Sequence, residues 1–272
     1  MSGLASSLAG KVSIITGASS GLGRAIALAF SKHGATVVCA DREASSQGRD
    51  QPTDELIQLR GGRSLFVPTD VTKADEVREL VRAAAYKFGR VDVMVNNAGI
   101  APEASSPRPV NETSDEVFDA TWQVNARGVF LGCKYAGQQM LTQPRLPGHH
   151  NAGSIINLSS VLGVLGLSGT PAYAASKGAV LALTRTVSMD YAPHGIQCNS
   201  ILPGFTRTPM IASMSEDREV EQTLIECHPL QRLGDPEEIA NVAVFLASDY
   251  ASGITGVNLS VDGGLHAQLR LK

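Results

Sequence analysis

The stretch Thr16-Gly17-Ala18-Ser19-Ser20-Gly21-Leu22-Gly23-Arg24 decides the fold of this 272-residue chain. It follows a β-branched run at residues 12–16 and precedes an apolar segment at residues 25–30 that is typical of a packed helix. Glycines after a strand let the backbone approach a pyrophosphate, and the next helix directs free N–H groups and the positive end of its dipole at that anion. The spacing TGxxxGxG, which differs from GxGxxG, therefore predicts a phosphate-binding turn.

Short β-branched runs recur along the rest of the chain, each followed by a segment of helical period. Several runs are apolar almost throughout, which is typical of parallel strands covered on both faces. The spacing of Val77, Leu80, Val81, Ala84 and Phe88 predicts one buried helix face. We expect a single domain over residues 1–272, a Rossmann-like, doubly wound α/β fold with a seven-stranded parallel sheet. The expected strands are residues 12–16, 36–40, 64–68, 91–96, 154–158, 197–202 and 257–260.

The composition excludes several classes of protein. Apolar residues make up 43% and charged residues 18% of the chain, which argues against disorder. With 23 Lys and Arg against 26 Asp and Glu, the net charge of −3 gives no reason to expect a nucleic acid partner. No apolar run approaches the roughly 18 to 20 residues that cross a bilayer, and the first ten residues lack a signal-peptide pattern. We therefore expect a soluble, cytoplasmic protein without membrane contact.

The cysteines and the paired histidines give no strong indication of a metal site. Four cysteines lie far apart and form no CxxC pattern, so we expect reduced thiols. His149 and His150 lie in a Pro- and Gly-containing loop at residues 142–152. Because divalent sites usually need three or four ligands, we expect a solvated loop there, with a metal site as the alternative. Residues 101–109, with three prolines, predict a second surface insertion.

Several further stretches occur in a fixed order after the glycine turn. Together with that turn they resemble the short-chain dehydrogenase/reductase family, from about residue 10 to residue 264. The resemblance implies a hydride transfer between a nicotinamide cofactor and an alcohol or ketone. The stretches are Asp70-Val71-Thr72, Asn96-Asn97-Ala98-Gly99, Asn125, Ser160, Tyr173-Ala174-Ala175-Ser176-Lys177, Pro203-Gly204 and Val261-Asp262-Gly263-Gly264.

The resemblance also implies which residues hold the dinucleotide. Asp70 and Val71 would contact the adenine, although Asp70 also suits the N-cap of a helix starting near Lys73. Thr208 occupies the place that holds the nicotinamide carboxamide, whereas Thr206 stands where the family often has Ile or Val. The expected cofactor-binding residues are Gly17, Ser19, Ser20, Gly21, Leu22, Gly23, Asp41, Arg42, Asp70, Val71, Asn97, Ala98, Gly99, Tyr173, Lys177, Pro203, Gly204, Thr206 and Thr208.

The end of the second expected strand bears on the choice of cofactor. Asp41 lies some 20 residues after the glycine turn, where a carboxylate accepts both hydroxyls of an adenosine ribose. A 2′-phosphate at about 4 Å would be repelled by ~1 to 4 kcal/mol, or roughly five-fold to several hundred-fold against NADP. Arg42 offsets part of that repulsion if its guanidinium turns toward a phosphate. We expect NAD, with NADP as the alternative.

Two residues of a predicted helix over 171–192 are the candidate proton-transfer groups. Tyr173 and Lys177 are four residues apart and so share one helix face. The lysine charge and the positive ring of the oxidised cofactor both favour a phenolate, which would act as a general base. Ser160, thirteen residues before Tyr173, would stabilise charge on the substrate oxygen, with its neighbour Ser159 as the alternative. Asn125, in a helix expected over 115–139, completes the family's catalytic tetrad.

The substrate region is predicted to be apolar, although the same side chains also suit ordinary packing. Residues 207–228 resemble a mobile substrate lid, and residues 230–239 with the last strand resemble the region that builds homotetramers, with a dimer as the alternative. We expect the substrate to be a small molecule, a mainly apolar secondary alcohol or ketone. The alternatives are an NADPH-dependent 3-oxoacyl or polyketide-type ketoreductase and a non-catalytic nucleotide-sensing scaffold. The expected pocket residues are Met210, Ile211, Met214, Leu224, Ile225, Val161, Leu162, Val164, Leu165 and residues 101–107.

Overall fold

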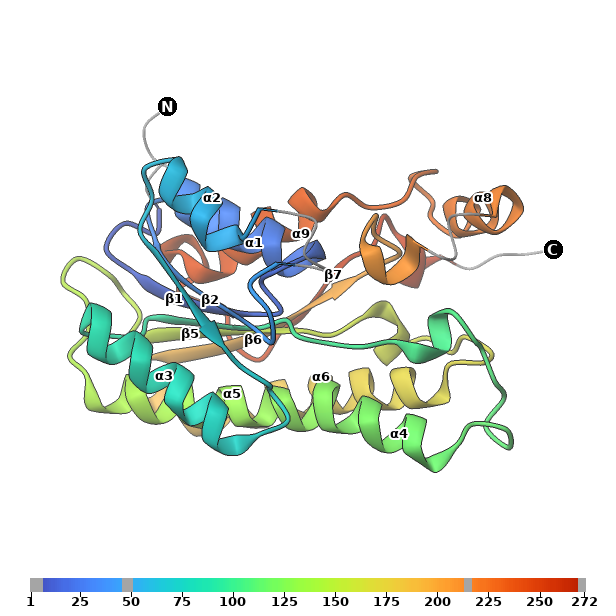
Figure 1. Ribbon diagram of the computed structural model, residues 1–272, viewed down its shortest axis with the longest axis horizontal. Helices are drawn as coiled ribbons and strands as arrows, with labels where there is room; N and C mark the ends of the chain where they lie inside the picture. The colour runs from blue at the N-terminus through green and yellow to red at the C-terminus, as the bar shows by residue number, and fades with distance from the viewer. Residues whose placement is uncertain (1–6, 46–50, 213–216, 269–272) are drawn as a thin grey trace.

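A parallel sheet of seven strands lies between two layers of helices (Figure 1). The structure, a computed structural model, describes residues 7–45, 51–212 and 217–268. Within them the strand order is β3-β2-β1-β4-β5-β6-β7, and the switch point lies between β1 and β4. The strands are β1 (Val12–Thr16), β2 (Thr36–Asp41), β3 (Ser64–Pro68), β4 (Val93–Asn96), β5 (Gly153–Leu158), β6 (Ile196–Pro203) and β7 (Asn258–Val261).

The doubly wound fold and all seven predicted strands are confirmed, with ends that differ by at most two residues. The largest difference is at β4, which begins at Val93 instead of Val91. The backbone of Val91 bonds to the side chain of Gln143, whose Nε2 donates to the Val91 carbonyl and whose Oε1 accepts from its N–H. Because a side chain satisfies both polar groups of Val91, ladder pairing starts further along the chain.

The helices cover the two faces of the sheet with separate cores. One face packs α1 (Gly21–Lys32), α2 (Thr53–Leu59) and α9 (Pro236–Ala247) around side chains such as Phe30 and Ile15. The opposite face packs the helices α3, α5 and α6 (Figure 1). The buried face predicted for α3 is confirmed. Val77, Leu80, Val81 and Ala84 are buried, and the partly buried Phe88 packs against the same core. The remaining helices are α3 (Ala74–Phe88), α4 (Asp115–Trp122), α5 (Gly128–Thr142), α6 (Pro171–Tyr191) and α8 (Arg218–Glu226).

The single helix expected over residues 115–139 is wrong in one respect. A π-helical turn, η3 (Gln123–Arg127), separates α4 from α5 and contains Asn125. The Asn125 side chain bonds to both backbone groups of Ile100, so the wider turn presents a polar side chain to a neighbouring loop. Such π-turns often occur at functional sites.

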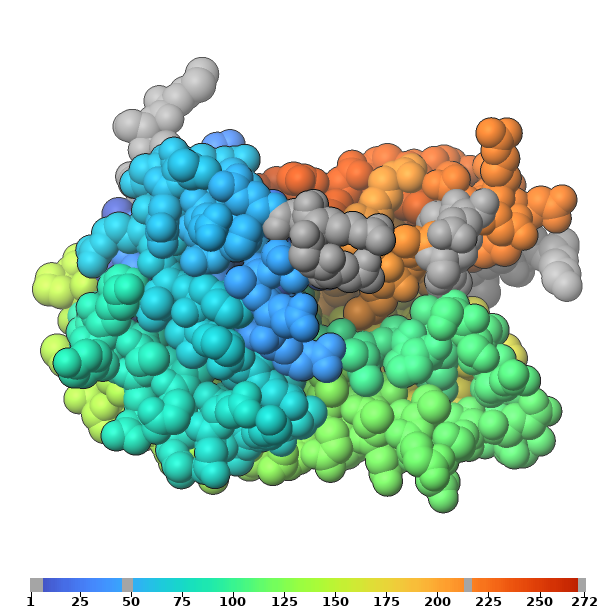
Figure 2. All heavy atoms as spheres, viewed as in Figure 1, coloured from blue at the N-terminus to red at the C-terminus, as the bar shows by residue number. Residues whose placement is uncertain are grey.

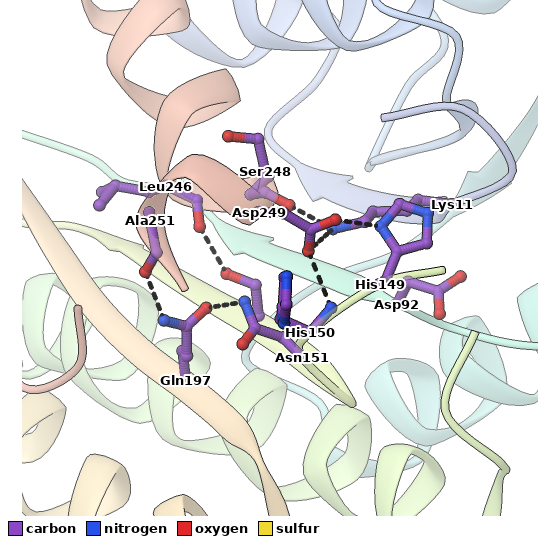
Figure 3. Close-up of polar contacts among 12 residues, drawn as sticks. Lys11, Asp92, His149, His150, Asn151, Gln197, Leu246, Ser248, Asp249 and Ala251 are labelled. Carbon is purple, nitrogen blue, oxygen red and sulfur yellow. Dashed lines mark hydrogen bonds and ion pairs between the residues drawn. The ribbon is translucent and has the colours of Figure 1, made fainter. Parts of the chain in front are cut away.

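The expectation of a solvated loop at residues 142–152 is also wrong for His149. Its Nδ1 lies 2.8 Å from Asp249 Oδ2, and its side chain is only 16% exposed. Lys11 Nζ lies 4.0 Å from Asp249 Oδ1, and the exposed His150 donates its backbone N–H to that oxygen (Figure 3). No group of three or more His, Cys, Asp or Glu suited to a metal ion occurs in the part of the chain that the structure describes.

Two further observations concern the chain as a whole. All four cysteines are free thiols, as expected, and three of them are buried. Among residues 7–45, 51–212 and 217–268, no helix combines the length and the apolar character that crossing a membrane requires.

Candidate active site

A cavity of about 600 Å³ opens at the carboxyl ends of the strands. The blue, green and orange parts of the chain meet on this side of the molecule (Figure 2), so segments far apart in sequence bound the cavity. Ligands of doubly wound sheets bind at this edge, at the switch point. Most of the predicted site residues line this one cavity: Gly17, Ser20, Gly21, Leu22, Asp41, Arg42, Asp70, Val71, Asn97, Ala98, Gly99, Ser160, Tyr173, Lys177, Pro203, Gly204, Thr206 and Thr208.

The glycine turn is packed too closely for side chains at two positions. A Cβ on Gly23 would lie 2.0 Å from the Gly17 carbonyl oxygen, and one on Gly17 would lie 2.8 Å from Asn97 Nδ2. Gly17 also has a φ of +67°, which L side chains rarely adopt. Gly23 is not among the residues that line the cavity, and its lack of a side chain lets α1 pack closely against the Gly17 carbonyl.

The start of α1 is suited to an anion. Its N-cap residue, Ser20, makes no side-chain capping bond, and no acidic residue occupies the first turn. The backbone N–H groups at this end and the positive end of the helix dipole therefore face the cavity without a carboxylate from the first turn beside them. These features fit the pyrophosphate of a dinucleotide.

Two carboxylates, those of Asp41 and Asp70, line the part of the cavity where the sequence predicts the adenosine. Asp41, at the end of β2, accepts the backbone N–H groups of Ser19 (3.1 Å) and Arg42 (2.8 Å). Ser19 stands behind the wall, where its hydroxyl donates to a backbone carbonyl. The exposed Arg42 lies close enough to Asp70 for its positive charge to lower the pKa of the Asp70 carboxyl. The ribose-facing position predicted for Asp41 is thus preorganised by backbone donors.

Asp70 does not cap a helix, which removes the alternative that we considered for it. The N-cap residue of α3 is Lys73, and the Asp70 Oδ1 instead accepts from the N–H and the hydroxyl of Thr72 at 3.0 and 2.7 Å. Burial alone would raise the pKa of the Asp70 carboxyl, but the bonds from Thr72 and the charges of Lys73 and Arg42 hold it below its ordinary value. Asp70 is therefore ionised at neutral pH.

Asn97 connects the glycine turn to the segment after β4. Its Nδ2 donates to the carbonyl oxygens of Thr16 and Gly17 at 2.9 and 3.3 Å. The Thr16 hydroxyl in turn accepts the backbone N–H groups of Asn97 and Ala98. These reciprocal bonds hold the phosphate-binding turn against the edge of β4.

Tyr173 and Lys177 both lie on α6 and both face the cavity. Lys177 Nζ lies 5.6 Å from the centroid of the Tyr173 ring and donates to the Leu158 carbonyl at 2.9 Å. Burial lowers the pKa of the Lys177 amine to about 8. Burial also raises the pKa of the Tyr173 phenol, opposed by a hydrogen bond with Ser160. Burial outweighs this bond, so the pKa of the phenol lies above its ordinary value, and the lowering that we expected from the lysine charge is not found in the structure.

The geometry separates the two adjacent serines. The Ser159 hydroxyl donates to the Lys177 backbone carbonyl at 2.8 Å and is committed to that bond. The Ser160 oxygen accepts from the Leu162 N–H at 3.1 Å and bonds with the Tyr173 side chain. Both residues line the cavity, but only the Ser160 side chain is directed at the phenol.

Asn125 lies behind the wall of the cavity and is fully buried. Its Oδ1 accepts the Ile100 N–H (2.8 Å), while its Nδ2 donates to the Ile100 carbonyl (2.9 Å) and to the Ser176 hydroxyl (3.1 Å). Asn125 therefore ties the loop after β4 to α6, one residue before Lys177.

Glu103 lies within residues 101–107, which we expected on the wall of the substrate pocket, but no role was predicted for its carboxylate. It falls in the segment that we predicted to be a surface insertion, yet its side chain is 2% exposed and lines the cavity. Its carboxylate accepts the backbone N–H groups of Ala172 and Tyr173. The only signal in the sequence was one acidic residue in a stretch otherwise rich in Pro, Ser and Ala, and this pattern does not predict which groups the carboxylate bonds to.

The end of the cavity away from Asp41 is mainly apolar, and only part of the predicted set contributes. Val164 is 55% exposed, Leu224 is buried, and neither lines the cavity; Met214 falls outside the described residues. Thr206 is buried and donates to the Gly204 carbonyl. The apolar side chains that line the cavity include Ala101, Ala104, Pro107, Val161, Leu162, Leu167, Met210 and Ile211.

Comparisons with known proteins agree with this arrangement. The family model described as enoyl-(acyl carrier protein) reductase matches residues 17–266. The chain is 40% identical over 258 residues to a 3-oxoacyl-(acyl-carrier-protein) reductase of Thermotoga maritima, covering 95% of this chain and 98% of that one. It is also 40% identical over 258 residues to 3beta-hydroxysteroid dehydrogenase 1 of Eggerthella lenta, at 95% and 94% coverage. A crystal structure of a short-chain type dehydrogenase/reductase from Mycobacterium marinum superimposes with a TM-score of 0.85, 32% identity and coverage of 96% and 97%.

Proposed function

Because this chain belongs to the short-chain dehydrogenase/reductase family, we propose that it oxidises a neutral, mainly apolar secondary alcohol, or reduces the matching ketone, with NAD as the preferred cofactor. It is an oxidoreductase that acts on CH–OH or carbonyl groups and uses a nicotinamide dinucleotide. The preferred dinucleotide, the substrate class and the roles of individual residues are the parts that we infer.

One observation carries the proposal: Tyr173, Lys177 and Ser160 converge on the cavity whose other end holds the glycine turn. A phenol, an ammonium and a hydroxyl at the carboxyl edge of the sheet are suited to moving a proton on and off a substrate oxygen. The uncapped N-terminus of α1 supports binding of the pyrophosphate at the other end.

The protein groups have separate roles in this proposal. In alcohol oxidation the Tyr173 oxygen accepts the proton of the substrate hydroxyl, while the Ser160 hydroxyl donates to the same substrate oxygen. The Lys177 ammonium, with a pKa of about 8, is mostly protonated at neutral pH and stabilises negative charge on the phenol oxygen. In the reverse direction the phenol returns the proton. When bound, the nicotinamide ring supplies the carbon that accepts or releases the hydride.

The preference for NAD rests on Asp41. Its carboxylate is held at the end of β2 by two backbone N–H groups, so it cannot easily turn away from a ribose. A 2′-phosphate in the same place would be repelled, and the exposed Arg42 offsets only part of that repulsion.

The proposed substrate is neutral because of the charges around the cavity. The charged residues among the described lining are Asp41, Arg42 and Asp70 at the adenosine end, and Lys177 and Glu103 near the phenol. Among the described lining residues, Lys177 is the one cation at this end, and in the proposal its charge acts on the Tyr173 oxygen, so a substrate carboxylate would find no cation of its own. The wall around them is mainly apolar, which suits a hydrocarbon skeleton.

A second candidate substrate is a 3-oxoacyl thioester, reduced with NADPH. The Thermotoga maritima relative and the description of the family model favour it, whereas the Eggerthella lenta relative, equally similar, favours an alicyclic alcohol. Sequence similarity therefore does not separate the two substrates, and the preference for an alcohol comes from Asp41 and the apolar wall.

Two further parts of the proposal concern the lid and the assembly. We infer that the described parts of the predicted lid, residues 207–212 and 217–228, act as the substrate lid, because Met210 and Ile211 line the cavity. A homotetramer would cover apolar side chains that the single chain leaves exposed. These are Phe118, Trp122 and Phe130 on α4 and α5, and Leu230, Phe245 and Tyr250 near the C-terminus.

The test is a set of secondary alcohols and ketones with NAD(H) and NADP(H), followed by the absorbance of the reduced nicotinamide. We expect turnover of apolar, uncharged substrates and a loss of at least about 100-fold in kcat for Tyr173→Phe. Binding of the dinucleotide, measured by calorimetry, should change little in that variant. Undiminished turnover by Tyr173→Phe would refute the assignment of the proton-transfer group, and turnover of 3-oxoacyl thioesters alone would favour the second candidate.

A further inference from the structure

The N-terminus of α6, which carries Tyr173, has no cap of its own. The helix begins at Pro171, which has no backbone N–H, and the preceding Thr170 makes no capping bond. Its hydroxyl donates instead to the Leu167 carbonyl at 2.9 Å. The next backbone N–H groups, those of Ala172 and Tyr173, therefore need acceptors from elsewhere.

Glu103 supplies both acceptors from a different part of the chain. Its Oε1 lies 3.1 Å from the Ala172 nitrogen and its Oε2 lies 2.8 Å from the Tyr173 nitrogen. The following N–H, that of Ala174, already bonds to the Thr170 carbonyl at 3.0 Å. The carboxylate thus caps the two open donors of this turn, and its charge lies at the positive end of a 21-residue helix.

Glu103 belongs to a short segment that also holds the dinucleotide end of the site. The segment begins at Asn97, which bonds to the backbone of the glycine turn, and continues through Ile100, which is bonded in both directions to Asn125. It ends in the 3₁₀ turn η2 (Pro102–Ala104), where Glu103 is 2% exposed. Side-chain bonds therefore connect residues 97–103 to the phosphate-binding turn at one end and to α6 at the other.

We propose that Glu103 is a positioning residue for the reaction: it fixes the first turn of α6 and so sets where the Tyr173 hydroxyl lies. The inference rests on the proposed function, because it takes Tyr173 as the group that moves the proton. Both Glu103 oxygens are engaged by backbone donors, so Glu103 acts through Tyr173 and not on the substrate. Helix ends fray when their donors lack partners, and a displacement of about 1 Å at a reacting group can cost about 100-fold in rate.

The decisive variant is Glu103→Gln, which keeps the size of the side chain but replaces one acceptor oxygen with an NH₂ group that faces an N–H donor. We expect kcat to fall by about ten-fold to 100-fold, the Kd for the dinucleotide to change by less than about two-fold, and Tm to fall by about 2–4 °C. Glu103→Asp keeps the charge on a shorter chain and should recover part of the lost kcat.

The matched control is Asp92→Asn. Asp92 is also a buried carboxylate, 5% exposed, that accepts a backbone N–H, that of Val12, and it pairs with Arg90 at the far end of the sheet. Asp92→Asn should lower Tm by a similar amount while kcat stays within about two-fold of the wild type. The control separates general loss of stability from misplacement of the phenol.

The outcomes separate a failure of the positioning role of Glu103 from a failure of the proposed function. A Glu103→Gln enzyme with wild-type kcat, or a kcat loss matched by Asp92→Asn, would overturn the role of Glu103 even if Tyr173→Phe is inactive. Full activity of Tyr173→Phe would instead overturn the proposed function. A kcat loss in Glu103→Gln that is partly rescued in Glu103→Asp, with dinucleotide binding intact, supports the positioning role.

Discussion

The two ends of the cavity are constructed in different ways. At the proposed dinucleotide end, the glycine turn, the start of α1 and the end of β2 all come from the first 41 residues, and Asn97 holds the turn from a distant segment. At the catalytic end, Tyr173 depends on Glu103 some 70 residues away, and Lys177 is held by Leu158 from another element. The proposed dinucleotide end is therefore built mostly from one stretch of the chain, whereas the catalytic end combines residues from several distant segments.

This difference determines how each end responds to change. A local turn fails through steric crowding, since its glycines have backbone neighbours that cannot move away. The catalytic end fails through loss of hydrogen bonds and charge, because buried polar groups there depend on single partners. Variants at the two ends should therefore affect different measurements.

The largest expected effect within the catalytic end is the difference between two neighbouring serines. Ser160→Ala should lower kcat by about 100-fold to 1000-fold, because it removes a donor to the substrate oxygen. Ser159→Ala should lower kcat by less than about ten-fold, since the Ser159 hydroxyl bonds to the Lys177 carbonyl and only supports the helix. Steady-state kinetics of both variants checks this; equal losses would mean that the two hydroxyls share one role.

At the dinucleotide end, Gly23→Ala should weaken dinucleotide binding by about ten-fold to 100-fold. The new Cβ would lie 2.0 Å from the Gly17 carbonyl oxygen, so the turn must shift, and overpacking of this kind costs about 1–3 kcal/mol. Gly253→Ala is the control, because a Cβ there would meet no atom within 4 Å. Calorimetric Kd values for both variants test the prediction, and an unchanged Kd in Gly23→Ala would show that the turn tolerates a side chain.

The same contrast explains how much of the fold the sequence predicted. All seven strands follow from local apolar runs and glycines, so their positions were predicted closely. The π-helical turn at Asn125 was not, because it depends on the Ile100 backbone packed beside it. Likewise, the sequence around His149 gives no sign of Asp249, which lies 100 residues away.

For the candidate site, motifs predicted which residues meet at the cavity but not how they are held. The TGxxxGxG and YxxxK spacings predicted Gly17, Tyr173 and Lys177 as site residues, and all three line the cavity. The role of Glu103 was missed because capping from a distant loop leaves no periodic signal. The raised pKa of the Tyr173 phenol was not predicted either, since burial is a property of the packed structure and does not follow from the YxxxK spacing.

Burial of Lys177 should make the stability of the protein depend on pH. Burial lowers the pKa of the amine from 10.5 to about 8, so between these values the unfolded chain binds more protons and the free energy of unfolding rises with pH. Relative to Lys177→Met, the wild type should gain about 2 kcal/mol between pH 8 and pH 10. Above pH 10 the raised pKa of Tyr173 acts in the opposite direction. Urea unfolding at several pH values tests this, and parallel curves for the two proteins would contradict it.

The smallest effect belongs to the cofactor preference, because Asp41 is only half-buried and Arg42 is exposed. In such a place the effective dielectric is close to that of water, so the repulsion between the Asp41 carboxylate and a 2′-phosphate is ~1 kcal/mol. Asp41→Ala should therefore shift the ratio of kcat/KM for NAD and NADP about five-fold toward NADP, whereas Arg42→Ala should shift it toward NAD. Asp75→Ala, which removes an exposed carboxylate of α3 paired with Arg78, should leave the ratio unchanged. If Asp41→Ala also leaves the ratio of kcat/KM unchanged, backbone geometry and not the Asp41 charge selects the cofactor. Cofactor choice would then depend on the path of the backbone at the end of β2.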